Sequence, residues 1–434
     1  CYSDPNFNCD DRNNYSVNPW LNREEEVFML SKRMKQKMRL TITFVLAFFF
    51  FMSMDVQATI EEGNPEGEAF LDTETIAEEQ LEALNIDELQ RFWEDVLTEY
   101  GGFLPESQKG SLYEFISGEK EFSLKEWFKG ILKFMFHEFL ANGKLLGSIV
   151  LLTIFSVFLQ TLQNAFEKST ISKVAYAIVF MVLIIMALNS FHIVLDYTSE
   201  TVSKMIHFIL ALIPLLLALI VSSGGVVSAA FFHPVILFLM NTSGMFIQYI
   251  VLPLLMLSAL LSIVSILTEH YKVTQLAGLL RNWSIGLLGL FLTVFLGVIS
   301  VQGAATAVTD GVTLRTAKFM TSNFIPVIGR FFTDATDTVI SASVLLKNTV
   351  GIAGVAIVLL IAAFPAVKIL LIAFTYKFAA AILQPLGGGP VISCLDVISK
   401  SIIYVFAALA IVSLMFFLSI TVIVAAGNLT MMVR

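Results

Sequence analysis

Long apolar stretches follow one another from residue 145 to the end of the chain. The clearest are Val174–Leu195, Met205–Val221, Ile247–Leu267 and Ile402–Ala425. A helix satisfies its own backbone hydrogen bonds, and about 20 apolar residues of it cross a hydrocarbon core of about 30 Å. The pattern predicts an all-α fold class, with residues 145–434 forming a polytopic transmembrane helical bundle of about seven to nine membrane segments.

Short polar segments separate the expected spans. Ser222–Gly225 predicts a tight helical hairpin or a re-entrant pair, and Asp196 and Glu200 predict a loop between two spans. From an exported N-terminal region, about nine passes would leave Arg434 in the cytoplasm. Under the positive-inside rule, two other loops are cytoplasmic because of their bases, Lys168, Lys173, Lys272 and Arg281.

The N-terminal part carries a secretory pattern. A basic segment, Lys32–Arg39, precedes an apolar core, Leu40–Met54, and the small residues of Val56–Ala58 suit signal peptidase. We interpret residues 29–58 as a signal peptide cleaved after its last residue, with a retained anchor as the alternative. Residues 1–28 are polar and aperiodic, and are interpreted as an untranslated extension or a disordered tail.

The next segment, residues 59–121, is acidic and would be exported. A small helical cap is expected within it, with a solvated acidic linker as the alternative. Residues 122–144 alternate aromatic residues with lysines and predict an amphipathic helix in the membrane interface. The helix of the acidic segment is predicted by apolar residues at three- and four-residue steps, namely Leu81, Leu84, Ile86, Leu89, Phe92, Trp93, Val96 and Leu97.

Composition and charge agree with this division. Hydrophobic residues make up 56% of the chain and charged residues 14%, which is more apolar surface than a soluble domain can bury. The net charge of -8 conceals a segregation: residues 59–125 hold 18 acids and four bases, whereas residues 126–434 hold 10 acids and 16 bases. The acidic exported region argues against nucleic acid as a partner and leaves membrane lipid as the expected environment.

Small residues recur within several expected spans. Because they let helix backbones approach closely in lipid, we expect them to lie at helix contacts. The residues are Gly286, Gly289, Gly297, Gly351, Gly354, Ala407, Ala408 and Ala410.

Ionisable residues between Gln302 and Asn348 form the candidate site, since charges near lipid are expensive and usually face protein or water. Asp310 and Lys318, eight residues apart, form one pair on a helical face. A longer polar stripe beside the Pro326 break is expected to line a water-filled path or to contact a partner. The alternative is an interfacial helix with a solvated polar face. The stripe consists of Arg330, Asp334, Asp337, Ser341 and Asn348.

Patterns for catalysis, metal binding and cofactor binding are missing from the sequence. The histidines occur singly, without a His-Glu-x-x-His helix, and no Cys-x-x-Cys pair exists. Gly387–Pro390 lacks the Lys-Ser/Thr of a phosphate loop and is interpreted as a turn. No catalytic residue, metal or cofactor is therefore expected, and enzyme is the least expected class.

Nine short segments, taken in their order along the chain, resemble the stage III sporulation protein AE family. The resemblance covers about residues 29 to 434, and residues 1–28 depart from it. The segments are Lys144–Val150, Gln163–Glu167, Asn189–His192, Phe232–Pro234, Val301–Gly303, Phe324–Arg330, Asp334–Val339, Leu346–Asn348 and Gln384–Leu386.

This resemblance implies a role in spore development after engulfment. It implies a place in the mother-cell membrane around the forespore, with the N-terminal region in the intermembrane space, and membership of a transenvelope channel or secretion-like complex. The implied partners are other stage III sporulation membrane proteins, a cytoplasmic secretion-type ATPase and intermembrane ring proteins. The residues themselves leave open two alternatives, an autonomous ion-coupled secondary transporter and a non-conducting assembly scaffold.

Overall fold

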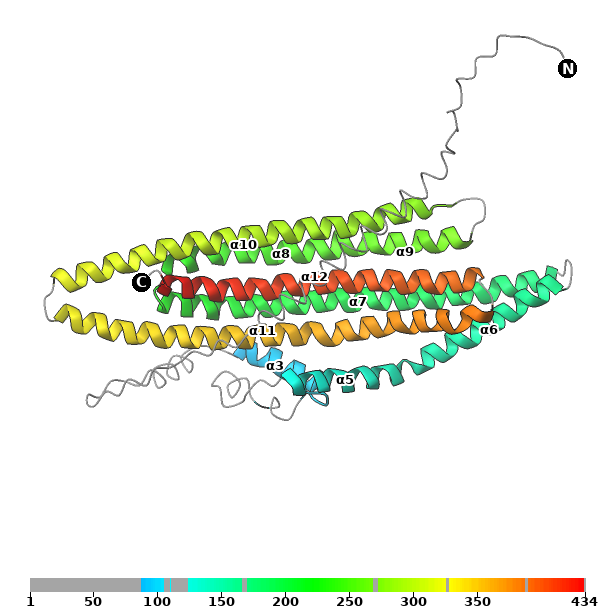
Figure 1. Ribbon diagram of the computed structural model, residues 1–434, viewed down its shortest axis with the longest axis horizontal. Helices are drawn as coiled ribbons and strands as arrows, with labels where there is room; N and C mark the ends of the chain where they lie inside the picture. Colours follow the sequence, from blue (N-terminus) through cyan, green and yellow to red (C-terminus); the bar gives the residue numbers. More distant parts are fainter. Residues whose placement is uncertain are drawn as a thin grey trace, which may run out of the picture. The chain divides into compact units, whose positions relative to one another are not determined.

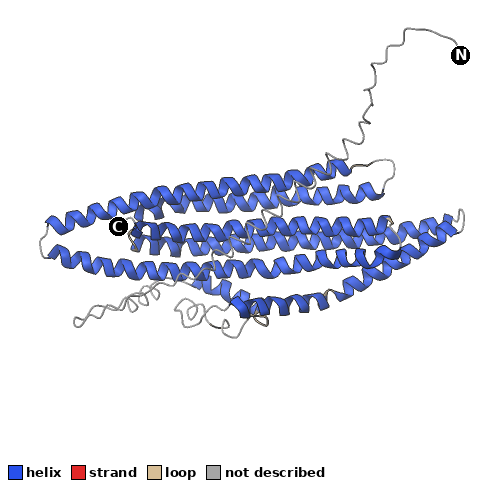
Figure 2. Cartoon of the chain, in the orientation of Figure 1, coloured by secondary structure: helices blue, strands red, loops and turns tan. Residues whose placement is uncertain are grey.

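The computed structural model describes residues 87–104, 110, 124–165, 170–267, 272–324, 328–386 and 389–432. Figure 2 shows that almost all of these residues are helical. Contacts divide the chain into residues 1–69 and 70–434, and every described residue belongs to the second unit. The expected extension, the signal peptide and the acidic segment before residue 87 therefore lie outside the described residues.

The expected helix of the acidic segment is confirmed for its second half, and further helices follow among the described residues. The elements are α3 (Asp87–Tyr100), α5 (Leu124–Ala141), α6 (Gly143–Ala165), α7 (Thr170–Ser222), α8 (Val226–Phe246), the π-helical η2 (Ile247–Val251), α9 (Leu252–Leu267), α10 (Thr274–Phe324), α11 (Ile328–Leu383), the 3-10 turn η3 (Gln384–Leu386) and α12 (Pro390–Met432). The elements α8, η2 and α9 form one continuous helical run.

Six helical stretches among the described residues are long and apolar enough to cross a membrane. They support a polytopic helical membrane protein. Four of them contain 49, 42, 44 and 48 residues, so that several segments expected as separate spans are joined in one helix. The stretches are Gly143–Leu162, Val174–Ser222, Val226–Leu267, Thr274–Ala317, Thr336–Leu383 and Pro390–Ala425.

The expected loop at Asp196 and Glu200 is wrong, because α7 continues through both residues. Polar side chains of this segment find partners on the helix itself. The hydroxyl of Thr198 donates to the carbonyl of the residue four positions earlier at 2.8 Å, and Lys204 pairs with Glu200 at 3.0 Å. Such i, i+4 contacts stabilise a helix, and the segment contains neither Gly nor Pro to end it.

Helix α12 lies at the centre of the packing. It contacts α7, α9, α10 and α11. Figure 1 shows it between α10 and α11. Its side chains Ile402, Val405, Leu409, Val412 and Phe416 are fully buried. The long helices are mostly apolar, so most of the side chains that meet between them are apolar, although Asp310 and Lys347 are also buried.

The C-terminal ends of α6, α9 and α11 lie at one end of the helices, and the α7–α8 turn lies at the other (Figure 1). The C-terminal end of α12 shares the α7–α8 end. Six single crossings from an exported N-terminal region would return the chain to the exported side, so the expected cytoplasmic C-terminus does not follow from this topology. In the sequence, Lys173, Lys272 and Arg281 lie near the starts of α7 and α10, and Lys377 and Lys400 lie in the parts of α11 and α12 next to the junction of these two helices.

The expected role of small residues is confirmed at two glycines of α11. A Cβ at Gly351 would collide with Val424 of α12, and one at Gly354 would collide with Leu212 of α7. By contrast, a Cβ at Gly286, Gly289 or Gly297 of α10 would meet no atom within 4 Å. These three glycines contact no neighbouring helix within the described part of the chain.

Candidate functional site

Asp310 is the candidate residue with the best defined contacts. It lies on α10 and is 1% exposed. Its Oδ1 accepts a hydrogen bond from the backbone N–H of Val227 at 2.9 Å, and its Oδ2 accepts one from Ser228 at 2.9 Å. These residues open α8, whose own N-cap residue, Gly225, makes no side-chain cap. Asp310 therefore caps α8 from another helix, with its charge at the positive end of the helix dipole.

The turn that presents these amides is a Schellman motif. Gly224 has φ of 91°, its N–H donates to Val221 at 2.9 Å, and the N–H of Gly225 donates to Ile220 at 2.8 Å. A positive φ strains any residue with a Cβ, so glycine is required at position 224. The expected tight hairpin at residues 222–225 is confirmed, and we call Gly224, Gly225 and Asp310 the α7–α8 clamp.

The clamp shows what sequence reasoning missed about Asp310. The sequence predicts a pair between Asp310 and Lys318, eight residues later. In the structure, the hydrogen-bond donors to Asp310 are two backbone amides 82 and 83 positions away. Lys318 lies on α10, and its side chain is outside the described set. The Asp310–Lys318 pair therefore stays a prediction.

The five residues of the polar stripe lie together on α11, but only three have described side chains. Asp337 and Asn348 are half-buried, and Ser341 is exposed. The Ser341 hydroxyl donates to the carbonyl of Asp337 at 2.8 Å. Among the described residues, Oδ1 of Asn348 is buried without a hydrogen-bond partner. Arg330 and Asp334 belong to the first turns of α11, where side chains are not described.

Lys347 is a site residue that the stripe did not include. It is 0% exposed and shares a buried face of α11 with Ile340, Ser343 and Val350. The helical spacing from Asp334 places Asn348, the residue after Lys347, on the stripe. Counting from the apolar Ile340 by three or four residues would have found Lys347. An ionisable side chain buried in an apolar helix is a functional candidate by default.

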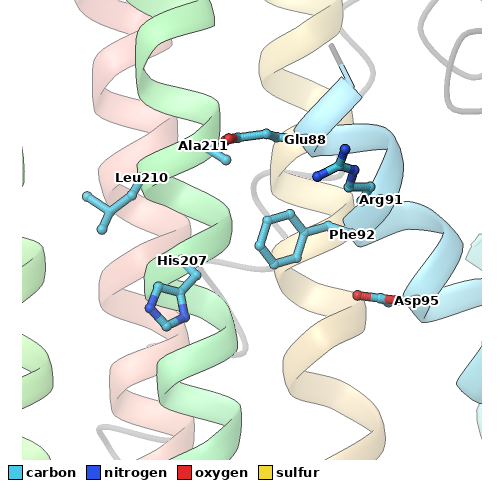
Figure 3. Close-up of a pocket in the computed structure, with 7 residues that line it drawn as sticks. All are labelled: Glu88, Arg91, Phe92, Asp95, His207, Leu210 and Ala211. Atoms are coloured by element: carbon cyan, nitrogen blue, oxygen red, sulfur yellow. The ribbon is translucent and has the colours of Figure 1, made fainter.

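A second candidate region is the cleft of about 470 Å³ between α3 and α7 (Figure 3). Glu88, Arg91 and Asp95 of α3 and His207 of α7 supply its polar groups. Figure 3 shows Glu88, Arg91 and Asp95 extending from α3 toward α7, which carries His207. The arrangement offers charges of both signs on a surface that we expect to be exported.

Contacts with the bundle hold α3 in place. Glu99 pairs with Lys204 of α7 at 3.4 Å, and the Tyr100 ring stacks on Phe364 of α11 with centroids 4.1 Å apart. Phe92 meets Phe208 edge-to-face. Burial raises the pKa of Tyr100 above its usual value, and the hydrogen bond of its hydroxyl to Glu99 raises it further. These contacts support a helical cap rather than a solvated linker for this helix.

Comparison with known proteins places the bundle in a family. The family model described as stage III sporulation protein AE matches residues 107–427. A curated relative, "Stage III sporulation protein AE" of Bacillus subtilis (strain 168), is 72% identical over 361 residues, which cover 83% of this chain and 90% of that protein. The chain belongs to the stage III sporulation protein AE family. No solved structure matches it.

Membership of the stage III sporulation protein AE family covers the helices that carry the candidate residues. The family match includes α5 to α12, with the α7–α8 clamp, the polar stripe and Lys347, whereas α3 precedes it. Together with the six apolar helices, the match identifies a membrane-embedded sporulation protein.

Proposed function

We propose that this protein is a membrane subunit of a transenvelope channel or secretion-like complex that links mother cell and forespore and is required for spore development after engulfment. Its family membership supports a role in sporulation. The observation that supports a subunit, rather than a protein working alone, is the length of the apolar surface on α10.

Exposed apolar side chains follow one face of α10 along nearly its whole length. They recur at helical spacing and none is covered within the described part of the chain. The face consists of Leu276, Leu279, Trp283, Leu290, Val294, Val298, Val301, Val308, Val312 and Met320. We call it the α10 face.

The α10 face is too long for lipid alone to cover it. At about 1.5 Å per residue, the helix rises about 66 Å between Leu276 and Met320. A hydrocarbon core of about 30 Å encloses about 40 Å of a helix tilted by 40°, which is the upper end of observed tilts. At least one end of the face therefore lies beyond the hydrocarbon, where large exposed apolar patches mark protein contacts.

Three glycines on the same helix suit such a contact. Gly286, Gly289 and Gly297 have open space where a Cβ would stand, so another helix could approach the α10 backbone closely. In Gly351 and Gly354 the same chain uses glycine for this purpose internally. The α10 face thus has the composition of a helix–helix interface.

In this proposal the protein is not an enzyme and has neither metal nor cofactor. It lies in the mother-cell membrane with its N-terminal region in the intermembrane space. Its partners are other stage III sporulation membrane proteins, a cytoplasmic secretion-type ATPase and intermembrane ring proteins. The exported cap and its mixed-charge cleft at Glu88 and Arg91 are available to the ring proteins.

One observation favours a second candidate, an autonomous ion-coupled secondary transporter. Lys347 is fully buried among apolar helices, and buried ionisable groups carry ions or protons in many transporters. A transporter should move solute in liposomes that contain this protein alone. A channel subunit should need its partners, and a pure scaffold should conduct in neither case.

Photocrosslinking in sporulating cells tests the proposal. A photoreactive residue is placed at Leu276, Val294 or Met320 on the α10 face, with the buried Leu288 on the same helix as the control. We expect protein adducts from at least one end of the face, and only internal adducts from Leu288. Lipid adducts alone at all three exposed positions would contradict a subunit role and favour the transporter.

A further inference from the structure

We propose that the cleft between α5, α11 and α12 binds an anionic phospholipid, with an acyl chain in the cleft and the phosphate on Lys377 and Lys400. The site requires only that the chain is embedded in a membrane, and it is independent of the proposed channel role. No candidate residue of the polar stripe or the α7–α8 clamp contributes to it.

The cleft has the size and lining of an acyl-chain site. Its volume is about 500 Å³, within the range of about 300–1,000 Å³ for small-ligand pockets. Phe136 and Phe139 of α5, Leu370 and Phe374 of α11, and Ile403 of α12 supply apolar walls. A cleft with these walls favours hydrocarbon over water.

The cleft is open on its outer side. Phe136 is 60% exposed and Phe374 is 48% exposed, although Phe374 also contacts Phe139 and stacks on Phe378. A membrane lipid can therefore enter from the side without any helix moving. The exposed phenylalanine rings present an apolar surface to the acyl chains of the lipid.

One end of the cleft is positively charged. Lys377 lines the cleft and pairs with Asp396 of α12, which also pairs with Lys400 at 2.7 Å. A single carboxylate between two ammonium groups leaves one net positive charge. The side chains of Lys377 and Lys400 are 55% and 57% exposed, so both remain accessible to an anion. Basic pockets between membrane helices are suited to anionic headgroups.

The order of residues along α11 fixes the orientation of the lipid. Leu370 and Phe374 come first, and Lys377 follows one turn later, toward the end of the helix at Leu383. The phosphate would therefore lie toward the end of α11 and the start of α12. A free phosphate could use the lysines but would leave the apolar walls uncovered, whereas a phospholipid uses both.

Native mass spectrometry of the purified full-length protein tests this site. Phosphatidylglycerol and phosphatidylcholine with identical acyl chains are titrated separately, and inorganic phosphate is added as a competitor. We expect about fivefold tighter binding of phosphatidylglycerol, since one accessible basic residue near a membrane surface contributes roughly that factor. Leu370→Trp, which fills the cleft, should weaken binding of both lipids.

Two charge variants should shift lipid affinity in opposite directions. Lys377→Gln removes the net positive charge and should weaken phosphatidylglycerol binding about fivefold, whereas Asp396→Asn adds one net positive charge and should strengthen it by a similar factor. Both variants remove the Lys377–Asp396 pair, so a shared loss of structure would move both the same way. Lys129→Gln, at an exposed lysine of α5 outside the cleft, is the control and should change nothing.

Several outcomes would overturn the site. Equal affinities for the two lipids in the unsubstituted protein would show that the site has no preference for an anionic headgroup and would overturn the proposal. Shifts of the same sign in Lys377→Gln and Asp396→Asn would also overturn it. Full displacement of phosphatidylglycerol by equimolar inorganic phosphate would reassign the lysines to a free anion. Unchanged binding in Leu370→Trp would exclude the cleft.

Discussion

The carboxylate of Asp310 and the backbone N–H of Ser228 lie 2.9 Å apart, although 82 positions separate the two residues. This hydrogen bond joins α10 to the start of α8. It fixes how far the two helices are shifted along each other. The contact is buried, so water cannot replace either partner if one is removed.

Substitution of Asp310 should therefore destabilise the folded protein. We expect Asp310→Ala to lower the free energy of unfolding by about 1–3 kcal/mol, since two buried amides lose their acceptor. Asp310→Asn keeps one acceptor oxygen and should cost less. Denaturant unfolding in detergent measures both, and Thr313→Ala, an exposed position one turn away, should stay within about 0.5 kcal/mol. An unchanged Asp310→Ala protein would refute the cap.

Two glycine-to-alanine substitutions should act with opposite sign. Gly224→Ala forces a Cβ into a backbone with φ of 91° and close to Leu314, so we expect a loss of about 1–2 kcal/mol. Gly286→Ala places a methyl in open space within α10 and should stabilise that helix by up to about 1 kcal/mol. Thermal unfolding of both variants in one detergent checks the order. Equal effects would argue against the Schellman turn.

The docking of α3 should weaken at high pH. Burial raises the pKa of Tyr100, so its contribution to stability is complete below the usual tyrosine pKa of about 10 and is lost as pH rises through the higher folded value. Cleavage of α3 by an alkaline protease should therefore accelerate above pH of about 10. Tyr100→Phe, which keeps the stack on Phe364, should reduce the pH dependence of cleavage. Tyr249→Phe, at an exposed position, is the control and should not change it.

The orientation predicted from the basic loops can be tested by cysteine labelling. Single cysteines at Ser169 and Thr274, with Cys1, Cys9 and Cys394 replaced by Ala, should resist an impermeant thiol reagent until cells are opened. A cysteine at the exposed Val226, at the opposite end of the bundle, should react in intact protoplasts of non-sporulating cells that express the protein, because there the exported side faces the medium. The reverse labelling pattern would show that the protein has the opposite orientation in the membrane.

The polar stripe of α11 should matter for sporulation if it lines a path or contacts a partner. We expect Asp334→Ala combined with Asp337→Ala to abolish spore maturation after engulfment while the protein still accumulates in the membrane. Arg330→Glu should be similarly damaging, and pairing it with Asp334→Arg should restore part of the yield if the two form an i, i+4 ion pair. Spore counts measure the yield of each variant, and membrane immunoblots measure how much of the protein accumulates. Wild-type yield from the double Asp variant would indicate only a solvated face.

The sequence by itself determined the class of this protein. Stretches such as Val174–Leu195 contain no charge, and so much apolar surface is compatible only with helices in a membrane. It also indicated a turn between two helices at residues 222–225, because two adjacent glycines between apolar runs permit the positive φ that ends α7. These features depend on local chemistry, which a single chain displays without its fold.

Only the tertiary structure decided how the helices continue and which polar groups meet. The segment from Asp196 to Lys204 looks like a loop by polarity, yet it stays helical because its partners lie one turn away on α7 and, for Lys204, on α3. The Asp310 carboxylate accepts hydrogen bonds from two backbone amides of α8 that lie 82 and 83 positions away, which no local pattern indicates. Helical spacing groups Lys347 with the apolar Ile340, but only the structure shows that this face of α11 is buried. Helical spacing shows which residues share a face, but the direction in which that face points depends on the neighbouring helices.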